Sequence, residues 1–378
     1  MSGQSPESLL WEASSTGDLQ AVRQLLASST IDVNWRDPIA LRSSFYRACW
    51  HGHLAIVEEF LTDPRTDVNL VQHQAATPFC AACAYGRTEV VTRLLAFGDA
   101  IDISTPNNVG ATPFFFACQG GNLGIVDQLL LHPKVDINRG TNTGGTPFLV
   151  AAERGLVEIV KAMLLRPELD VNAHTVHGLT PLGAAANEGQ AEVMELLLAD
   201  PRLDVEANAN GPHSLLPLAC QEGLEKVVQV ILDDGRFPVN PMHTELPKPF
   251  LLACGFNQVK VVRRLLADPR LDVNYADNDN VTGLWLAAQS NYGEVAKWIL
   301  AVRSDVDVTL RSLPPTETGS EPWRDKTALE VAQLNSNDVA LLLEGYEADP
   351  RAIRGKLRRE LGLSGSSSFF STSSFFFF

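Results

Sequence analysis

The chain has 378 residues, a net charge of −15 and a hydrophobic content of 45%. That content is typical of a folded protein, and no stretch approaches the run of about 18–20 apolar residues that a membrane-spanning helix needs. A surface this acidic is expected to repel nucleic acid rather than bind it.

A short string recurs along the whole chain at steps of 34 or 35 residues. Asp32-Val33-Asn34 is followed by Asp67-Val68-Asn69, and degraded copies such as Asp102-Ile103-Ser104 keep the same step. A fixed period of this size is typical of stacked units, each of which cannot bury its apolar face without a neighbour. The repeat therefore predicts one stacked array instead of the two or three globular domains that length alone would suggest.

Each unit is predicted to begin with a short first helix. Thr77-Pro78 and Thr112-Pro113 are typical starts, because the hydroxyl accepts a bond from a free N–H and proline fits the first helical position. Weaker starts stand at Ser8, Ser43, Ser214, Lys248, Thr282 and Thr327. An alanine follows five residues after each start, as at Ala151. A small residue there lets two helices approach closely.

A glycine closes the first helix in most units, as Gly155 does, and is expected to adopt the left-handed conformation. Asn257, Asn291 and Ser336 occupy this place in the last units. A second helix follows with apolar pairs at helical spacing, for example Val261-Val262. It should end at Asp-Pro-Arg strings, because the residue before proline avoids the helical region.

These patterns resemble ankyrin repeats, and residues 144–155 are close to the family pattern. The resemblance implies an all-α solenoid of paired antiparallel helices with short inter-repeat loops, in about ten units. One departure is the family's histidine three residues after the threonine, which is absent throughout. Trp11, Tyr46, Phe115, Leu149 and Trp285 are among the residues in its place. Apolar packing is expected to replace the hydrogen bonds of that histidine.

The repeat array is predicted to cover residues 5–345, with an insertion at 310–326 before the last unit. A basic amphipathic helix at 346–363 is predicted to cap the array, although an anionic-partner or membrane-surface patch is the alternative. Residues 364–378 are rich in serine and phenylalanine and carry no charge, which indicates a disordered tail.

No cofactor or metal site is predicted. Cys80 and Cys83 have redox spacing, but five cysteines follow the repeated alanine, where other units carry alanine. Packing therefore outweighs a metal or redox role. The pairs His51/His53 and His174/His177 are interpreted as loop histidines. No catalytic constellation is present, so no enzyme is predicted.

The resemblance implies a scaffold or adaptor that binds a partner protein on the concave face and loop tips. In the family, the two residues before the turn glycine commonly make contacts. The matching candidates here are Trp50, His51, Tyr85, Glu153, Arg154, Glu188, Glu222 and Phe256. The alternative for Trp50 and Phe256 is packing against the neighbouring unit.

The glutamates among these candidates favour a basic partner. The six cysteines and the absence of an evident leader sequence favour the cytoplasm, with the nucleus as a second possibility. Two other functions stay open: a targeting arm or regulatory subunit of a larger enzyme assembly, and a microbial effector.

Overall fold

A computed structural model describes residues 5–205, 208, 214–241, 248–314, 322–335 and 338–363. The predicted tail, Ser336 and part of the predicted insertion lie outside these residues. The chain divides into two compact units, residues 1–203 and 204–378. The described residues form helices and one isolated β-bridge between Arg36 and Ser43. The all-α prediction is therefore confirmed.

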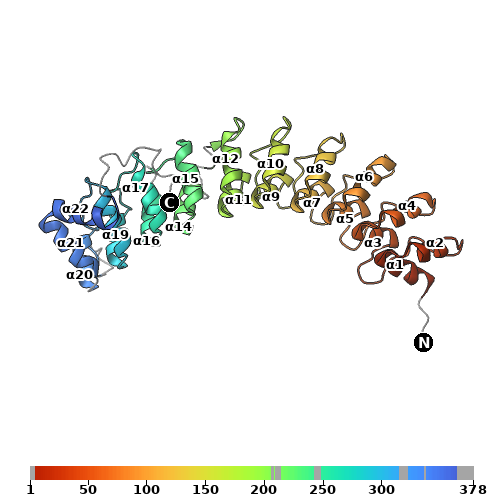
Figure 1. The fold of residues 1–378 in the computed structure, drawn as a ribbon, viewed down its shortest axis with the longest axis horizontal. Helices are drawn as coiled ribbons and strands as arrows, with labels where there is room; N and C mark the ends of the chain where they lie inside the picture. Colours follow the sequence, from red (N-terminus) through yellow and green to blue (C-terminus); the bar gives the residue numbers. More distant parts are fainter. Residues whose placement is uncertain are drawn as a thin grey trace. The chain divides into compact units, whose positions relative to one another are not determined.

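The helices of unit 1 come in consecutive pairs (Figure 1). The first helices are α1 (Pro6–Thr16), α3 (Ser44–His51), α5 (Pro78–Ala84), α7 (Pro113–Gln119), α9 (Pro147–Glu153) and α11 (Pro181–Asn187). The second helices are α2 (Leu19–Leu26), α4 (Leu54–Thr62), α6 (Thr88–Phe97), α8 (Leu123–Leu130), α10 (Val157–Leu164) and α12 (Ala191–Ala199).

Unit 2 repeats this arrangement. Its first helices are α14 (Leu215–Glu222), α16 (Pro249–Gly255), α18 (Gly283–Gln289) and α20 (Ala328–Leu334). Its second helices are α15 (Glu225–Asp234), α17 (Val259–Ala267), α19 (Gly293–Val302) and α21 (Asp338–Ala348), and α22 (Pro350–Glu360) follows. None of the helices within the described residues is long and apolar enough to cross a membrane.

The predicted helix starts are largely confirmed. Thr77, Thr112, Thr146 and Thr180 each accept a bond from the backbone N–H three residues later, and proline stands first in each helix. The start predicted at Ser8 is wrong. Ser5 caps α1 and accepts the Ser8 N–H at 3.2 Å, because Ser5-Pro6 supplies both the hydroxyl and the proline one turn earlier.

First helices pack on first helices, which is why the repeated alanine stays small. The α9 helix lies between α7 and α11, and Ala117, Ala151 and Ala185 are fully buried. Apolar pairs of the second helices, such as Ile159 and Val160, complete the core of each pair.

The turn glycines after the first helices, from Gly17 to Gly223, are left-handed, as predicted. Gly155 has φ +67°, and the Cβ of any other residue there would lie 2.3 Å from the Gln190 Oε1 of the next repeat. Asn257 and Asn291 keep the same conformation with φ of 56°. Asparagine tolerates this region better than other non-glycine residues, so the later turns keep their geometry without glycine.

Asn257→Val should lower the stability of unit 2 by about 1–2 kcal/mol, because a β-branched residue is strained at positive φ. Asn257→Gly should be neutral or slightly stabilising. Urea unfolding of the full chain followed by circular dichroism measures both. Equal midpoints for the valine and glycine variants would contradict this explanation of the turn.

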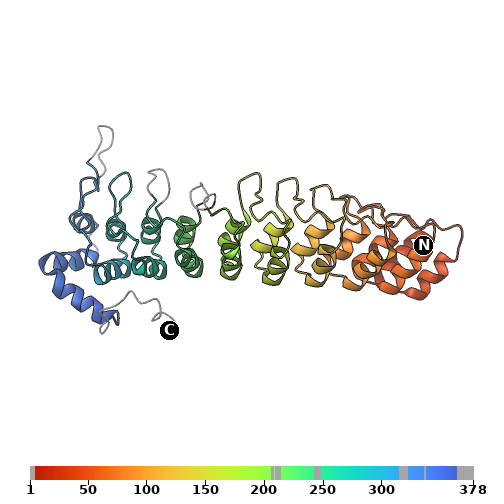
Figure 2. The ribbon, with the colours of Figure 1, turned by 90° about the horizontal axis from the view of Figure 1, so that it is seen from above.

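The recurring Asp-x-Asn string joins neighbouring loops, and in each unit these loops project to one side (Figure 2). Within a repeat, Asp67 accepts the backbone N–H of Asn69 at 3.0 Å. Between repeats, the Asn34 side chain donates to the Arg65 backbone oxygen at 2.8 Å and accepts the Asp67 N–H at 2.8 Å. Asn69, Asn138, Asn240 and Asn274 make the same pair of bonds. These asparagines fix the conformation of their own loops and link each of those loops to the following one.

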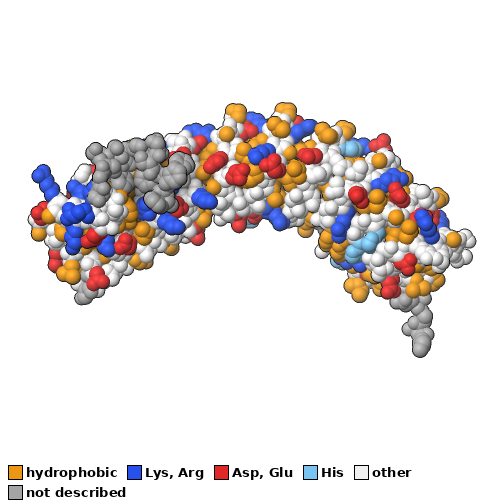
Figure 3. Space-filling model, viewed as in Figure 1, with side chains coloured by type: hydrophobic (Ala, Val, Ile, Leu, Met, Phe, Trp, Pro, Cys, Tyr) orange, Lys and Arg blue, Asp and Glu red, His pale blue; other side chains and the backbone are white. Residues whose placement is uncertain are grey.

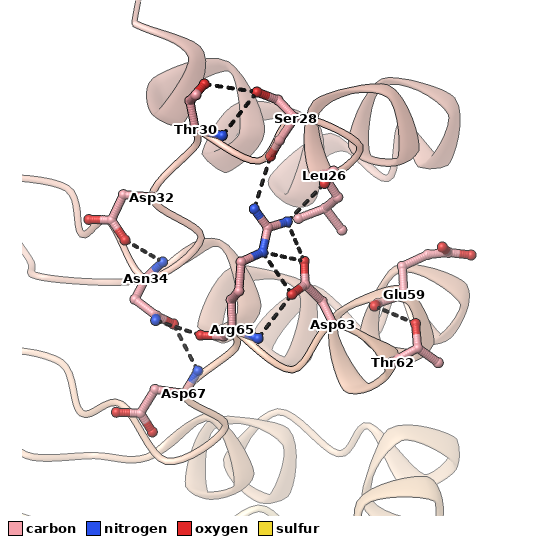
Figure 4. Close-up of polar contacts among 10 residues, drawn as sticks. All are labelled: Leu26, Ser28, Thr30, Asp32, Asn34, Glu59, Thr62, Asp63, Arg65 and Asp67. Carbon is pink, nitrogen blue, oxygen red and sulfur yellow. Dashed lines mark hydrogen bonds and ion pairs between the residues drawn. The ribbon is translucent and has the colours of Figure 1, made fainter.

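In three repeats, the arginine of Asp-Pro-Arg ties the second helix to the preceding second helix, as Figure 4 shows for Arg65. Arg65 is held by Asp63 and donates to the backbone oxygens of Leu26 and Ser28 at 2.8 and 2.9 Å. Arg202 is held by Asp200 and donates to the backbone oxygens of Leu164 and Arg166. Arg270 is held by Asp268 and donates to the backbone oxygens of Leu232 and Gly235. Each arginine thereby satisfies carbonyls that the preceding helix end leaves free.

At the end of unit 2, α22 packs on α19 and α21. Leu357 is buried there, and Arg354 donates to the backbone oxygens of Leu300 and Arg303 at 3.2 Å. Arg354 is thus part of the packing, whereas Arg351, Lys356 and Arg359 stay exposed. These contacts support the capping interpretation of this segment.

Candidate functional site

The predicted contact residues stand at the carboxyl ends of first helices. In unit 1, Trp50 and His51 close α3, Tyr85 follows α5, and Glu153 and Arg154 close α9. Glu188 follows α11 in the same position. In unit 2, Glu222 ends α14 and Phe256 follows α16. We call these helix ends, within each unit, the first-helix face.

Exposure divides the candidates. Arg154, Glu188 and Glu222 are exposed, and Glu153 is half-buried. Phe256 is 54% exposed and Tyr85 49%, which is high for large apolar side chains. Trp50 and His51 are half-buried. The exposed candidates can reach a partner directly, whereas Trp50 is already partly covered by its own chain.

Trp50 contacts aromatic rings from two repeats. Its ring centre lies 4.9 Å from that of Tyr85 in the next repeat and 6.0 Å from that of Tyr46. Trp50 therefore packs against the neighbouring repeat, through Tyr85, which is the alternative that the sequence left open. Tyr85 keeps half its surface exposed, so the pair still presents an aromatic surface.

Two arginines that the sequence argument missed complete this cluster. The guanidinium carbon of Arg42 lies 4.0 Å from the centre of the Trp50 ring, and that of Arg47 lies 5.0 Å from it. Arg47 also lies 4.6 Å from the Trp11 ring. Stacking of arginine on tryptophan is favourable because the cation meets the negative face of the ring. We call Trp11, Arg42, Arg47, Trp50 and Tyr85 the Trp50 cluster.

A signal for Arg47 was present in the sequence. It stands four residues after the helix start, where the next three units carry Ala81, Phe116 and Val150. A charge at a place that is apolar in neighbouring units marks a locally different surface. Arg42 carried no such signal, because it precedes the helix in a loop and reaches Trp50 only in three dimensions.

The electrostatics around His51 are positive. Burial lowers the pKa of His51, and the charges of Arg47, His53 and Arg87 lower it further. The pKa of Arg47 is lowered by burial and by the charge of Arg42. Figure 3 shows pale-blue histidine side chains adjoining blue basic ones over α3 and α5. This end of an acidic chain is thus locally basic.

We expect unit 1 to lose stability as the pH falls through about 6.5, the ordinary pKa of histidine. The unfolded chain binds a proton at His51 more readily than the folded chain, whose His51 pKa is lowered. His51→Gln should therefore reduce the drop in melting temperature between pH 7.5 and 5.5. Melting curves at both pH values test this, and an unchanged drop in the variant would contradict it.

The missing family histidine is partly replaced by tryptophan. Trp11 Nε1 donates to the backbone oxygen of Arg42 at 3.1 Å, and Trp285 Nε1 donates to that of Lys326 at 3.1 Å. The expectation that apolar packing replaces the hydrogen bonds of this histidine is therefore wrong for these two repeats. The indole N–H spans to the next loop, so it supplies a hydrogen bond between repeats.

The cysteines are buried and free. Burial raises the pKa of the Cys80 thiol to about 12, and it raises the pKa of the other five as well. Each thiol is thus a poor nucleophile at neutral pH. Among the described residues, no group of three or more His, Cys, Asp or Glu could hold a metal ion.

A family model described as ankyrin repeats (3 copies) matches residues 45–141, 124–210, 148–242 and 216–312. The four overlapping matches together span residues 45–312, which is more than half of the chain. A search of curated proteins finds no match to the chain.

Proposed function

The chain belongs to the ankyrin-repeat family, and from that premise we propose that it is a non-catalytic scaffold or adaptor that binds a partner protein. Ankyrin repeats generally mediate protein–protein interaction. The observation that carries the proposal is the pair of half-exposed aromatic side chains, Tyr85 and Phe256, at equivalent ends of first helices. Aromatic and arginine side chains dominate measured binding hot spots.

We further propose that the contacts lie on the first-helix face and the loop tips rather than on the second helices. On the loop tips of unit 1, Ile39 is 88% exposed and Val176 is 67% exposed. The exposed Glu188 and Glu222 favour basic residues in the partner. Six buried, free thiols support a reducing compartment such as the cytoplasm.

The test is affinity capture with the full chain, followed by two matched variants. The face variant combines Arg154→Ala, Glu188→Ala, Glu222→Ala and Phe256→Ala. The control variant combines Lys260→Ala, Glu192→Ala, Glu195→Ala and Leu165→Ala, which are exposed positions on the second helices or at their ends. Both sets remove one base, two acids and one apolar side chain.

We expect the face variant to lose the captured partner and the control variant to retain it, while both melt close to the wild type. Retention by the face variant together with loss by the control would place binding on the second helices and refute the proposal.

A further inference from the structure

Several arginines of unit 1 form ion pairs with a carboxylate of the same unit. Arg23 pairs with Glu59, Arg65 with Asp63, and Arg202 with Asp200, with closest N–O distances of 2.6–2.7 Å. This is the expected arrangement in a chain with 45 acidic and 30 basic residues. Arginines without such a partner are therefore informative where they gather in one place.

Three arginines around Trp50 form no ion pair within the described part of the chain: Arg42, Arg47 and Arg87. Arg47 donates its Nε–H to the Ser15 hydroxyl at 2.7 Å, and Arg87 donates to the Trp50 backbone oxygen at 2.8 Å. The Nε of Arg42 is buried and has no hydrogen-bond partner. A buried donor without a partner is costly, and with no ion pair in the described residues this guanidinium keeps its charge available to an anionic ligand.

The carboxylate of Asp37, on which the charge of Arg42 acts, is already engaged by the loop. Asp37 accepts the backbone N–H groups of Ile39 and Ala40 at 3.1 and 2.7 Å, and that of Arg42 at 2.8 Å. It fixes the loop that carries Arg42 and leaves the Arg42 guanidinium stacked over Trp50. The guanidinium is thus positioned by the fold before any ligand arrives, which reduces the entropy that binding costs.

We propose that the Trp50 cluster is the docking site for an acidic linear segment of the partner protein. Arg42 and Arg47 bind its Asp or Glu carboxylates, because the planar guanidinium matches a carboxylate with two parallel hydrogen bonds. Trp50 and Tyr85 supply the apolar surface beside them. The inference rests on the proposed function and adds the chemistry of the partner's segment at this end of unit 1.

Charge complementarity favours a peptide over a nucleic acid. Arg42, Arg47 and Arg87 lie in the second and third repeats of unit 1, and the same face carries Glu153 and Glu188 further along. A long polyanion would meet these carboxylates, and the net charge of −15 opposes it as a whole. A short acidic segment interacts with the arginines and stays clear of the glutamates.

The experiment selects peptides from a phage-displayed library of random twelve-residue segments on the immobilised full chain. A selected peptide is then synthesised with a fluorescent label and titrated with the wild type and two variants. The test variant is Arg42→Gln with Arg47→Gln. The control is Arg351→Gln with Arg359→Gln, which removes two exposed arginines from α22.

We expect the selected peptides to be enriched in Asp and Glu, and the test variant to bind at least tenfold more weakly while the control binds like the wild type. Because Arg47 also contacts Trp11 and Ser15, the wild type provides a second readout that does not depend on the variant folding. Its affinity for the peptide should fall several-fold between 50 and 500 mM NaCl.

Three results would overturn the proposal: no acidic enrichment, equal binding by the test variant, or salt-independent affinity. Binding of a twenty-nucleotide single-stranded DNA with the same loss in the test variant would assign the cluster to nucleic acid instead. Failure here is separable from failure of the scaffold function. A captured partner that binds the test variant normally would leave the scaffold function intact and refute only the docking site.

Discussion

Ala151→Leu should strongly destabilise unit 1. Ala151 is fully buried in α9, which packs against α7 on one side and α11 on the other. Three additional carbon atoms there have no space, so α9 must move away from a neighbouring first helix. Overpacking a site of this kind costs about 1–3 kcal/mol and occasionally more. Because stability in a stacked array depends on nearest neighbours, the damage should extend to the adjacent repeats.

The matched control is Ala199→Leu, the same change at an exposed position at the end of α12. It should shift the urea midpoint by an amount close to the experimental error. The two variants are compared by the midpoints of urea unfolding of the full chain, measured by circular dichroism. Equal shifts for both variants would contradict the packing of first helix on first helix.

Arg202→Ala is the second substitution with a large expected effect. It should lower the free energy of unfolding by about 2–3 kcal/mol. The side chain donates to the backbone oxygens of Arg166 and Leu164 at 2.8 and 2.9 Å and to both oxygens of Asp200. Its removal leaves the Asp200 carboxylate, whose side chain is 9% exposed, without its cation. The preceding helix end also loses the partner of its free carbonyls.

The pH dependence identifies the carboxylate as the cause. The hydrogen bond from Arg202 lowers the pKa of Asp200 below its usual range. That stabilisation is present above the ordinary aspartate pKa of about 3.9 and is lost as the pH falls through the folded value. The difference in the free energy of unfolding between the wild type and Arg202→Ala should therefore become smaller below pH 4.

Arg166→Ala is the control for this experiment, because the Arg166 side chain pairs with the half-exposed Glu168 at the surface. Exposed pairs contribute about 0–1 kcal/mol. If Arg166→Ala proved as damaging as Arg202→Ala, the role assigned to Asp-Pro-Arg in joining neighbouring second helices would be wrong.

The pairing of helices could be predicted because the signals are local. The cap at Thr146, the proline at position 147 and the glycine at position 155 act within one repeat, and each corresponds to a feature of the structure. Where two local signals compete, the prediction was wrong. Ser5-Pro6 and Ser8 both offer a cap for α1, and the period alone favoured the later one.

The bonds between repeats could not be predicted, because they join residues about 30–39 positions apart. The Asp-x-Asn string marked the period, but its role requires knowing that the Asn34 side chain reaches the Arg65 backbone. The same is true of the candidate site. Tyr85 and Trp50 were chosen by position in the repeat, whereas Arg42 joins them only through the path of its loop.

The measurement that most directly tests the central claim is hydrogen exchange of the full chain with and without the captured partner, read by mass spectrometry. Binding on the first-helix face predicts slower exchange on complex formation at the carboxyl ends of first helices and in the loops beside them, including the segments around Trp50 and Tyr85. The second helices α4, α6 and α10 should exchange at unchanged rates. Protection confined to those second helices, with the segments around Trp50 and Tyr85 unaffected, would contradict the account.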